Sequence, residues 1–115
     1  MKRCLVLTIG ILVLAGAALR AQSAAVDAGK KVYEAQKCAT CHMIAGKGGT
    51  MTKLYPLDGV ATKLKETDIR KWLTTPAEME AKLEKKPAVK MSSKKFEFKD
   101  ADLNGLVAYL MTLKK

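Results

Sequence analysis

Residues 38–42 read Cys38-Ala39-Thr40-Cys41-His42, and they include the only histidine of the 115-residue chain. The spacing of these side chains has a chemical consequence. Two thiols three positions apart near the end of a helix can reach the two vinyl groups on one side of a porphyrin, and the next residue then points its imidazole at the iron. This C-x-x-C-H pattern predicts one haem c, attached covalently through Cys38 and Cys41, with His42 as an iron ligand.

Two other interpretations of the motif fit the sequence less well. A thioredoxin-like C-x-x-C pair follows a strand within a βαβ pattern, and no such pattern is visible here. A zinc site needs four ligands, but only Cys38, Cys41 and His42 remain once Cys4, which lies in a predicted leader, is set aside. Haem attachment is therefore the favoured interpretation.

The second axial ligand cannot be a histidine, because the chain has no other. Methionine is the other common partner in electron-transfer haem proteins. Met43 adjoins His42 and cannot reach the opposite face of a haem, and Met51 follows too closely to cross it. Met79 and Met111 fall within predicted helices, where packing explains them.

Met91 is the remaining internal methionine. It lies in a predicted loop after Pro87, and enough chain separates it from His42 to pass around a haem. We therefore predict His42 and Met91 as the two metal ligands.

Hydrophobic spacing and turn residues predict a nearly all-α chain with much loop. One helix is expected over residues 26–38, running into the cysteines. A short helix is expected over residues 68–73, with Thr67 as its cap. The sequence Thr75-Pro76-Ala77-Glu78 has the capping residue, proline and glutamate of a helix start, and this helix is expected to end before Pro87.

The rest of the chain contains two predicted loops and a last helix. The glycine-rich residues 44–52 and the Tyr55-Pro56-Leu57-Asp58-Gly59 stretch are typical of loops and turns. Asp100 is predicted to cap the last helix. The apolar face of that helix consists of Leu103, Leu106, Val107, Leu110 and Leu113. No stretch alternates convincingly enough to predict a strand.

The N-terminal residues have the pattern of a secretory signal peptide. Two basic residues precede an apolar run over residues 5–19, and small residues follow it. The run is shorter than the roughly 20 residues of a membrane span. We predict a signal peptide over residues 1–23, cleaved after Ser23 or Ala25, and a single domain over residues 24–115. A leader retained as a membrane anchor is the alternative, and a bacterial periplasm is the expected location.

The charge of the chain indicates what kind of partner it meets. It has 21 basic and 11 acidic residues, a formal net charge of +10, and it remains basic without the leader. No arginine-rich stripe with interleaved aromatic residues appears, so a nucleic-acid site is not expected. Acidic protein surfaces or anionic lipid are the expected partners, although much of this charge is explained by solubility alone.

The mature sequence resembles class I c-type cytochromes along essentially its whole length. The resemblance depends on motifs that share their order and spacing with that family. They are Gly29 with Tyr33, Cys38-Ala39-Thr40-Cys41-His42, Pro56-Leu57, Trp72-Leu73-Thr74-Thr75-Pro76, Pro87-Ala88-Val89-Lys90-Met91 and Leu106-Val107-Ala108-Tyr109-Leu110. The chain departs from the pattern at Tyr55, where the family usually has a glycine before the proline.

The resemblance implies a small all-α cytochrome c fold. The N- and C-terminal helices would cross, and three to five helices would wrap around one covalent haem. Gly29 would allow the two helices to approach closely near Tyr109, and Tyr33 would pack at the same crossing.

The resemblance also implies roles for residues around the haem. The backbone carbonyl of Pro56 would accept the second ring N–H of His42 and fix its orientation, and Trp72 would pack beside the haem near Met91. The propionate partners stay open, with Arg70 and Lys53 among the candidates.

These expectations together describe a one-electron carrier that is not an enzyme. It is expected to be a monomer that meets redox proteins with acidic docking patches, in particular membrane respiratory complexes. Lysines expected around the exposed haem edge are Lys37, Lys47, Lys90, Lys94 and Lys95. The alternative function is an open-site haem protein, either a gas sensor or peroxidase-like, which requires that Met91 is not bound.

Overall fold

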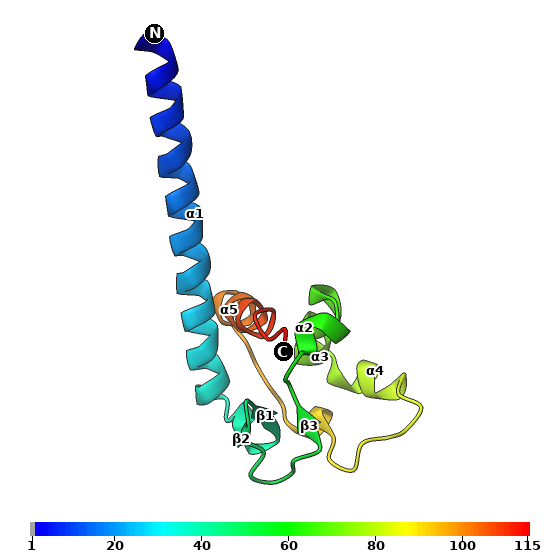
Figure 1. Ribbon diagram of the computed structural model, residues 1–115. Helices are drawn as coiled ribbons and strands as arrows, with labels where there is room; N and C mark the ends of the chain where they lie inside the picture. Colours follow the sequence, from blue (N-terminus) through cyan, green and yellow to red (C-terminus); the bar gives the residue numbers. More distant parts are fainter. Residues whose placement is uncertain (1) are drawn as a thin grey trace.

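The computed structural model describes the backbone of residues 2–115 and the side chains of residues 16–115. This part of the chain is mainly helical, as predicted (Figure 1). Its α-helices are α1 (Lys2–Ala35), α2 (Val60–Lys63), α3 (Glu66–Thr74), α4 (Pro76–Ala81) and α5 (Asp100–Leu110). Its other elements are the 3-10 turns η1 (Cys38–Thr40) and η2 (Met91–Ser93) and the strands β1 (His42–Ile44), β2 (Lys47–Gly48) and β3 (Tyr55–Pro56).

Helix α1 continues through the region where cleavage was predicted. Residues 16–24 of this helix are exposed, whereas Gly29 is buried. The basic start and most of the apolar run of the predicted leader lie outside the described side chains, so the signal peptide stays a prediction. In the part of the chain that the structure describes, no helix is both long enough and apolar enough to cross a membrane.

Helices α1 and α5 cross in contact with each other (Figure 1). Gly29 of α1 and Gly105 of α5 face each other at this crossing. A Cβ atom placed on Gly29 would lie 1.8 Å from the backbone oxygen of Gly105 and 2.8 Å from the Cβ atom of Tyr109. Beside this contact the rings of Tyr33 and Tyr109 meet edge to face, with their centroids 5.8 Å apart. The crossing predicted from Gly29, Tyr33 and Tyr109 is therefore confirmed. The sequence did not predict that Gly105 is the residue of α5 that contacts Gly29.

The buried core forms where α3 packs against the crossed helices. Its buried apolar side chains are Tyr33, Ile69, Leu73, Leu106, Val107 and Leu110. The apolar face predicted for the last helix is confirmed in its centre, because Leu106, Val107 and Leu110 are buried there. Leu103 packs half-buried on the first turn of this face. Leu113 also packs half-buried against the core, but its place on the helix face was wrongly predicted, because α5 ends at Leu110.

The helix starts are only partly as predicted. Helix α4 begins at Pro76, directly after Thr75, as the proline indicated. The prediction of Thr67 as a cap is wrong, because α3 begins at Glu66 and the extended residue before it is Lys65. The prediction of Asp100 as a cap is also wrong, because the extended residue before α5 is Lys99 and Asp100 is the first helical residue, where its negative charge suits the helix dipole.

Helix α4 ends at Ala81, before Pro87 as predicted. The side chain of Lys86 folds back onto the end of this helix. Its Nζ atom donates to the carbonyl oxygens of Ala81 at 2.9 Å and Glu80 at 3.2 Å. The carbonyl of Glu80 also accepts from the N–H of Leu83 at 3.2 Å, so Lys86 and Leu83 together satisfy the helix end in place of a further turn.

The structure contains a small sheet that the sequence did not predict, with strand order β2-β1-β3. Strands of two or three residues are too short to show an alternating pattern. β1 and β2 form an antiparallel hairpin closed by Ala45 and Gly46. Both loop residues have positive φ, 51° and 75°, as a type I′ turn requires. β1 also pairs in parallel with β3, which lies beyond the intervening loop.

Because alanine is strained at positive φ, Ala45→Asn is expected to stabilise the protein. The left-handed region costs an ordinary L-residue roughly 1–2 kcal/mol, whereas asparagine tolerates it. We expect a gain of about 0.5–1 kcal/mol and a rise in Tm of about 3–6 °C, measured by thermal unfolding of the purified protein. Gly46→Ala is the matched control and should lower Tm. A lower Tm for Ala45→Asn would contradict this account of the turn.

Candidate functional site

The Cys38–His42 motif begins where α1 stops. The helix ends at Ala35, slightly earlier than predicted, and Lys37 adopts the left-handed conformation with φ 56°. The chain then makes the turn η1 and enters β1 at His42. Cys38 and Cys41 are both half-buried and are not joined to each other. The turn thus places two free thiols and the imidazole on consecutive short elements next to the end of the first helix.

The glycine-rich loop packs its backbone directly against this motif. The N–H of Gly49 donates to the carbonyl oxygens of Ala39 at 2.7 Å and His42 at 3.1 Å. Gly48 has a φ of 91°, and a Cβ atom there would lie 2.5 Å from the oxygen of His42. From the sequence these glycines indicated only a loop. The structure shows that they let the backbone of this loop approach the residues of the motif closely.

His42 is held by a hydrogen bond from its ring to a backbone carbonyl. Its Nδ1 atom lies 2.9 Å from the carbonyl oxygen of Tyr55. The prediction that Pro56 supplies this carbonyl is wrong, because the parallel register of β1 and β3 sets His42 opposite Tyr55. As the resemblance implied, the ring of His42 is bonded to a backbone carbonyl in the segment that follows the glycine-rich loop. The residue that supplies it is the one at which this chain departs from the family pattern.

The surroundings of His42 favour a neutral ring. Burial lowers the pKa of His42, and the hydrogen bond to Tyr55 offsets this only in part. A neutral imidazole that donates from Nδ1 keeps a lone pair on Nε2, which is the form that binds a metal. The arrangement therefore suits His42 as an iron ligand.

The free thiols do not resemble a reactive dithiol. Burial raises the pKa of Cys38 to about 11, and the nearby Cys41 adds to the shift. A redox-active or nucleophilic cysteine has its pKa lowered instead. Among the described side chains there is also no group of three histidine, cysteine or acidic residues that would bind a metal ion. These observations favour haem attachment over the thioredoxin-like and zinc interpretations.

Met91 opens the turn η2 and is half-buried against the core. The chain just before it contacts β3, where the N–H of Val89 donates to the hydroxyl oxygen of Tyr55 at 3.3 Å. The structure thus brings the methionine loop to the strand that orients His42. Met51, in contrast, is 62% exposed, and Met111 packs against the core as predicted. No contact in the structure tests Met91 as a ligand.

A buried carboxylate supports the other side of Met91. Glu80 on α4 is only 6% exposed, and its carboxylate accepts from the N–H of Ser92 at 2.9 Å and from its hydroxyl at 2.5 Å. Burial raises the pKa of Glu80, but the hydrogen bonds from Ser92 and from the N–H of Met91, with the charge of Lys90, leave it below its ordinary value. Sequence analysis missed Glu80, since it looks like any exposed helix residue.

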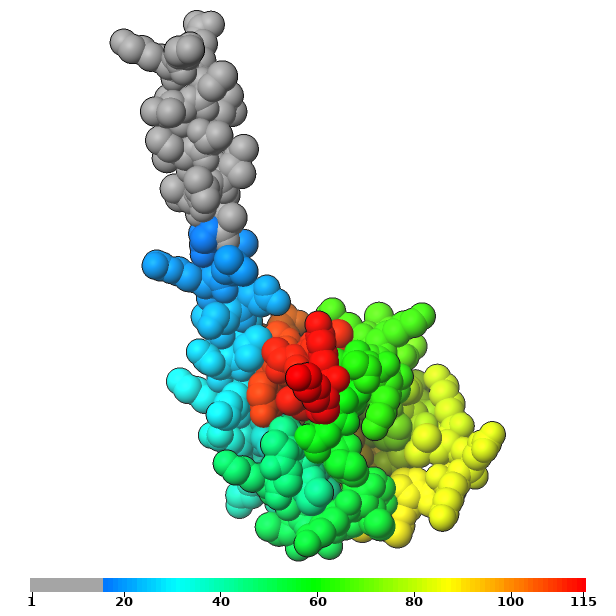
Figure 2. Space-filling view, viewed as in Figure 1, coloured from blue at the N-terminus to red at the C-terminus, as the bar shows by residue number. Residues whose placement is uncertain are grey.

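Most of the chain between α4 and η2 forms an outer lobe of the molecule, yellow in Figure 2. This lobe is rich in lysine. The lysines expected around the haem edge, which lie mostly outside the lobe, are all exposed, and they are Lys37, Lys47, Lys90, Lys94 and Lys95. These side chains are free to face a partner.

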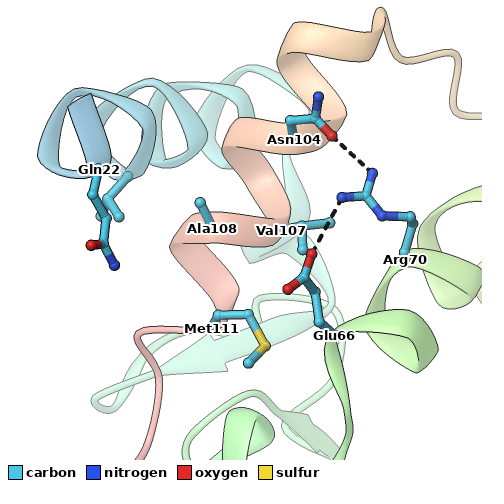
Figure 3. A pocket seen from close by; sticks show the side chains of 8 residues that line it. Gln22, Glu66, Arg70, Asn104, Val107, Ala108 and Met111 are labelled. Carbon is cyan, nitrogen blue, oxygen red and sulfur yellow. Dashed lines mark hydrogen bonds and ion pairs between the residues drawn. The ribbon is translucent and has the colours of Figure 1, made fainter. Parts of the chain in front are cut away.

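A groove of about 410 Å³ lies elsewhere, between α1, α3 and α5 (Figure 3). There Arg70 donates to the side-chain oxygen of Asn104 at 2.9 Å and pairs with Glu66 at 3.5 Å. None of Cys38, Cys41, His42 and Met91 lines this groove. Arg70 is engaged between two helices here, and its predicted contact with a propionate stays a prediction, as does that of Lys53.

Comparisons with known proteins agree with this arrangement. The family model described as Cytochrome c matches residues 26–114, which cover the helix crossing, the motif and the methionine loop. No curated protein and no solved structure matches the chain.

Proposed function

The chain belongs to the cytochrome c family and is a haem-binding electron carrier, and from this premise we propose that it is an exported monohaem protein with His42 and Met91 as axial ligands. It would carry single electrons between redox partners of a respiratory chain and perform no reaction on a substrate. The observation that supports this most directly is the hydrogen bond from Nδ1 of His42 to the carbonyl of Tyr55.

The residues of the motif fit a covalent haem. Cys38 and Cys41 are free and half-buried, so both thiols are available to form thioether bonds. His42 presents its second ring nitrogen because the first is occupied. When bound, the haem supplies a one-electron couple between ferrous and ferric iron. Cys38 and Cys41 would hold the ring, and the hydrogen bond to Tyr55 fixes the orientation of His42.

Met91 would complete the coordination with a thioether. Thioether ligation raises the reduction potential, and unchanged ligands in both oxidation states keep the rearrangement on electron transfer small. Redox titration of the purified protein tests the carrier function. A reversible one-electron transition with no catalytic consumption of peroxide is expected. Steady peroxide turnover by the wild-type protein would support the open-site alternative instead.

The exposed lysines are proposed to steer partners with acidic patches to the haem edge. We expect oxidation of the reduced protein by hexacyanoferrate(III), an anion, to slow severalfold as ionic strength rises. Oxidation by the cationic tris(phenanthroline)cobalt(III) should instead accelerate. Stopped-flow absorbance measures both rates.

The double variant Lys94→Glu/Lys95→Glu should reduce the rate with the anion more than Lys63→Glu/Lys65→Glu, which changes the net charge equally on exposed residues near α2. Equal effects of the two double variants would contradict a steering role for the lysines near Met91.

Location in a bacterial periplasm is proposed from the leader pattern, since haem attachment to C-x-x-C-H requires export. N-terminal sequencing of the protein from an expressing bacterium should find Ala24 or Val26 as the first residue. An intact N-terminus in the membrane fraction would instead indicate a retained anchor.

A further inference from the structure

Tyr55 forms hydrogen bonds with two different segments of the chain through its backbone carbonyl and its side-chain hydroxyl. Its backbone carbonyl accepts the Nδ1–H of His42 at 2.9 Å. Its side-chain hydroxyl accepts the N–H of Val89, two residues before Met91, at 3.3 Å. One residue therefore contacts both the proposed proximal ligand and the loop of the proposed distal ligand. A glycine at this position would provide the carbonyl but not the hydroxyl.

The opposite side of Met91 is fixed by Glu80. The carboxylate of this buried residue accepts from both the N–H and the hydroxyl of Ser92, the residue directly after Met91. Glu80 is on α4, and this helix contacts η2. The end of α4 is in turn satisfied by Lys86. The backbone around Met91 is thus anchored to β3 on one side and to α4 on the other.

We propose that the hydroxyl of Tyr55 and the carboxylate of Glu80 are positioning residues that together hold Met91 in place for the iron. The proposal depends on the His42 and Met91 ligation proposed above. The two anchors restrict the loop before the thioether binds, so that less conformational freedom is lost on ligation. Through Tyr55, the methionine loop is also hydrogen-bonded to the strand that orients His42.

Two conservative variants remove one anchor each. Tyr55→Phe keeps the ring and the carbonyl for His42 but removes the hydroxyl. Glu80→Gln keeps the side-chain shape but removes the charge and one acceptor. The matched controls are Tyr109→Phe, which removes a hydroxyl at the helix crossing, and Glu78→Gln, which changes an exposed carboxylate on the same helix. Gly46→Ala is a third control that destabilises the hairpin without altering either anchor.

Competition by imidazole for the iron of the oxidised protein measures how firmly Met91 is held. We expect both anchor variants to bind imidazole about tenfold more tightly than the wild type, which is the effect of losing one partly buried hydrogen bond. The near-infrared methionine-to-iron band should weaken in the same variants. Amide hydrogen exchange by NMR should accelerate at Val89 in Tyr55→Phe and at Ser92 in Glu80→Gln. All three controls should resemble the wild type in imidazole affinity.

The outcomes separate this proposal from the proposed function. If the wild type has the near-infrared band and both anchor variants bind imidazole as weakly as it does, the positioning role is overturned and the His/Met carrier stands. An equal gain in affinity for Gly46→Ala would also overturn it, because the effect would then follow from general destabilisation. A wild type without the band would overturn both proposals.

Discussion

Met91→Ala is expected to yield a high-spin haem that binds carbon monoxide, with His42 as the only protein ligand. The physical reason is that no second histidine exists and that Met51, the other loop methionine, is 62% exposed. Loss of the thioether should abolish the near-infrared band and lower the reduction potential by on the order of tenths of a volt, within the roughly 0.8 V over which ligands tune haem. Visible and near-infrared spectra and a carbon monoxide titration measure these changes.

The controls for this variant are other methionines of the chain. Met51→Ala and Met111→Ala should keep the wild-type spectrum, since Met51 is exposed and Met111 packs against the core. An unaltered spectrum for Met91→Ala would show that the ligand is wrongly assigned. Carbon monoxide binding by the wild type would show that the sixth position is already open, as in the alternative function.

Gly29→Ala is expected to destabilise the protein strongly, although alanine normally stabilises a helix by about 1 kcal/mol relative to glycine. The added Cβ would lie 1.8 Å from the backbone oxygen of Gly105, and backbone cannot move aside as a flexible side chain can. Helix α1 would have to shift away from α5 and from the Cβ atom of Tyr109. We expect a net loss of about 2–4 kcal/mol, a large part of the stability of a small domain. Denaturant unfolding of the haem-loaded protein measures it.

Two further variants give the expected order of effects. Gly105→Ala should cost less, because its Cβ would lie 3.1 Å from the nitrogen of Gly29 and only a small shift is needed. Lys31→Ala changes an exposed residue of α1 and should leave stability nearly unchanged. A Gly29→Ala protein as stable as the wild type would mean that the helices do not cross as closely as described.

The parts of this protein that follow from local sequence were predictable. The pentapeptide around His42 indicated haem attachment, and the family match agrees. The periodic spacing of Leu106, Val107 and Leu110 indicated a buried helix face, and these residues are in the core. In each case the motif or the hydrophobic repeat lies within a short stretch of consecutive residues. Its interpretation therefore does not require knowledge of contacts with distant parts of the chain.

The parts that depend on distant contacts were not predictable. The carbonyl partner of His42 was assigned to Pro56 instead of Tyr55, because all backbone carbonyls look alike in sequence and only the register of a two-residue strand distinguishes them. Glu80 was missed for a related reason. The role of Glu80 depends on its hydrogen bonds with Ser92, and these form only when the chain between α4 and η2 folds back onto α4.

The most direct test of the central claim is the absorption spectrum of the purified mature protein, oxidised and reduced, from the visible into the near-infrared. We predict sharp reduced bands and a near-infrared methionine-to-iron band in the oxidised state, which together indicate low-spin iron with His42 and Met91 bound. A high-spin spectrum would contradict Met91 ligation and favour a sensor or a peroxidase-like protein. A protein without any haem spectrum, produced where haem attachment operates, would contradict the account as a whole.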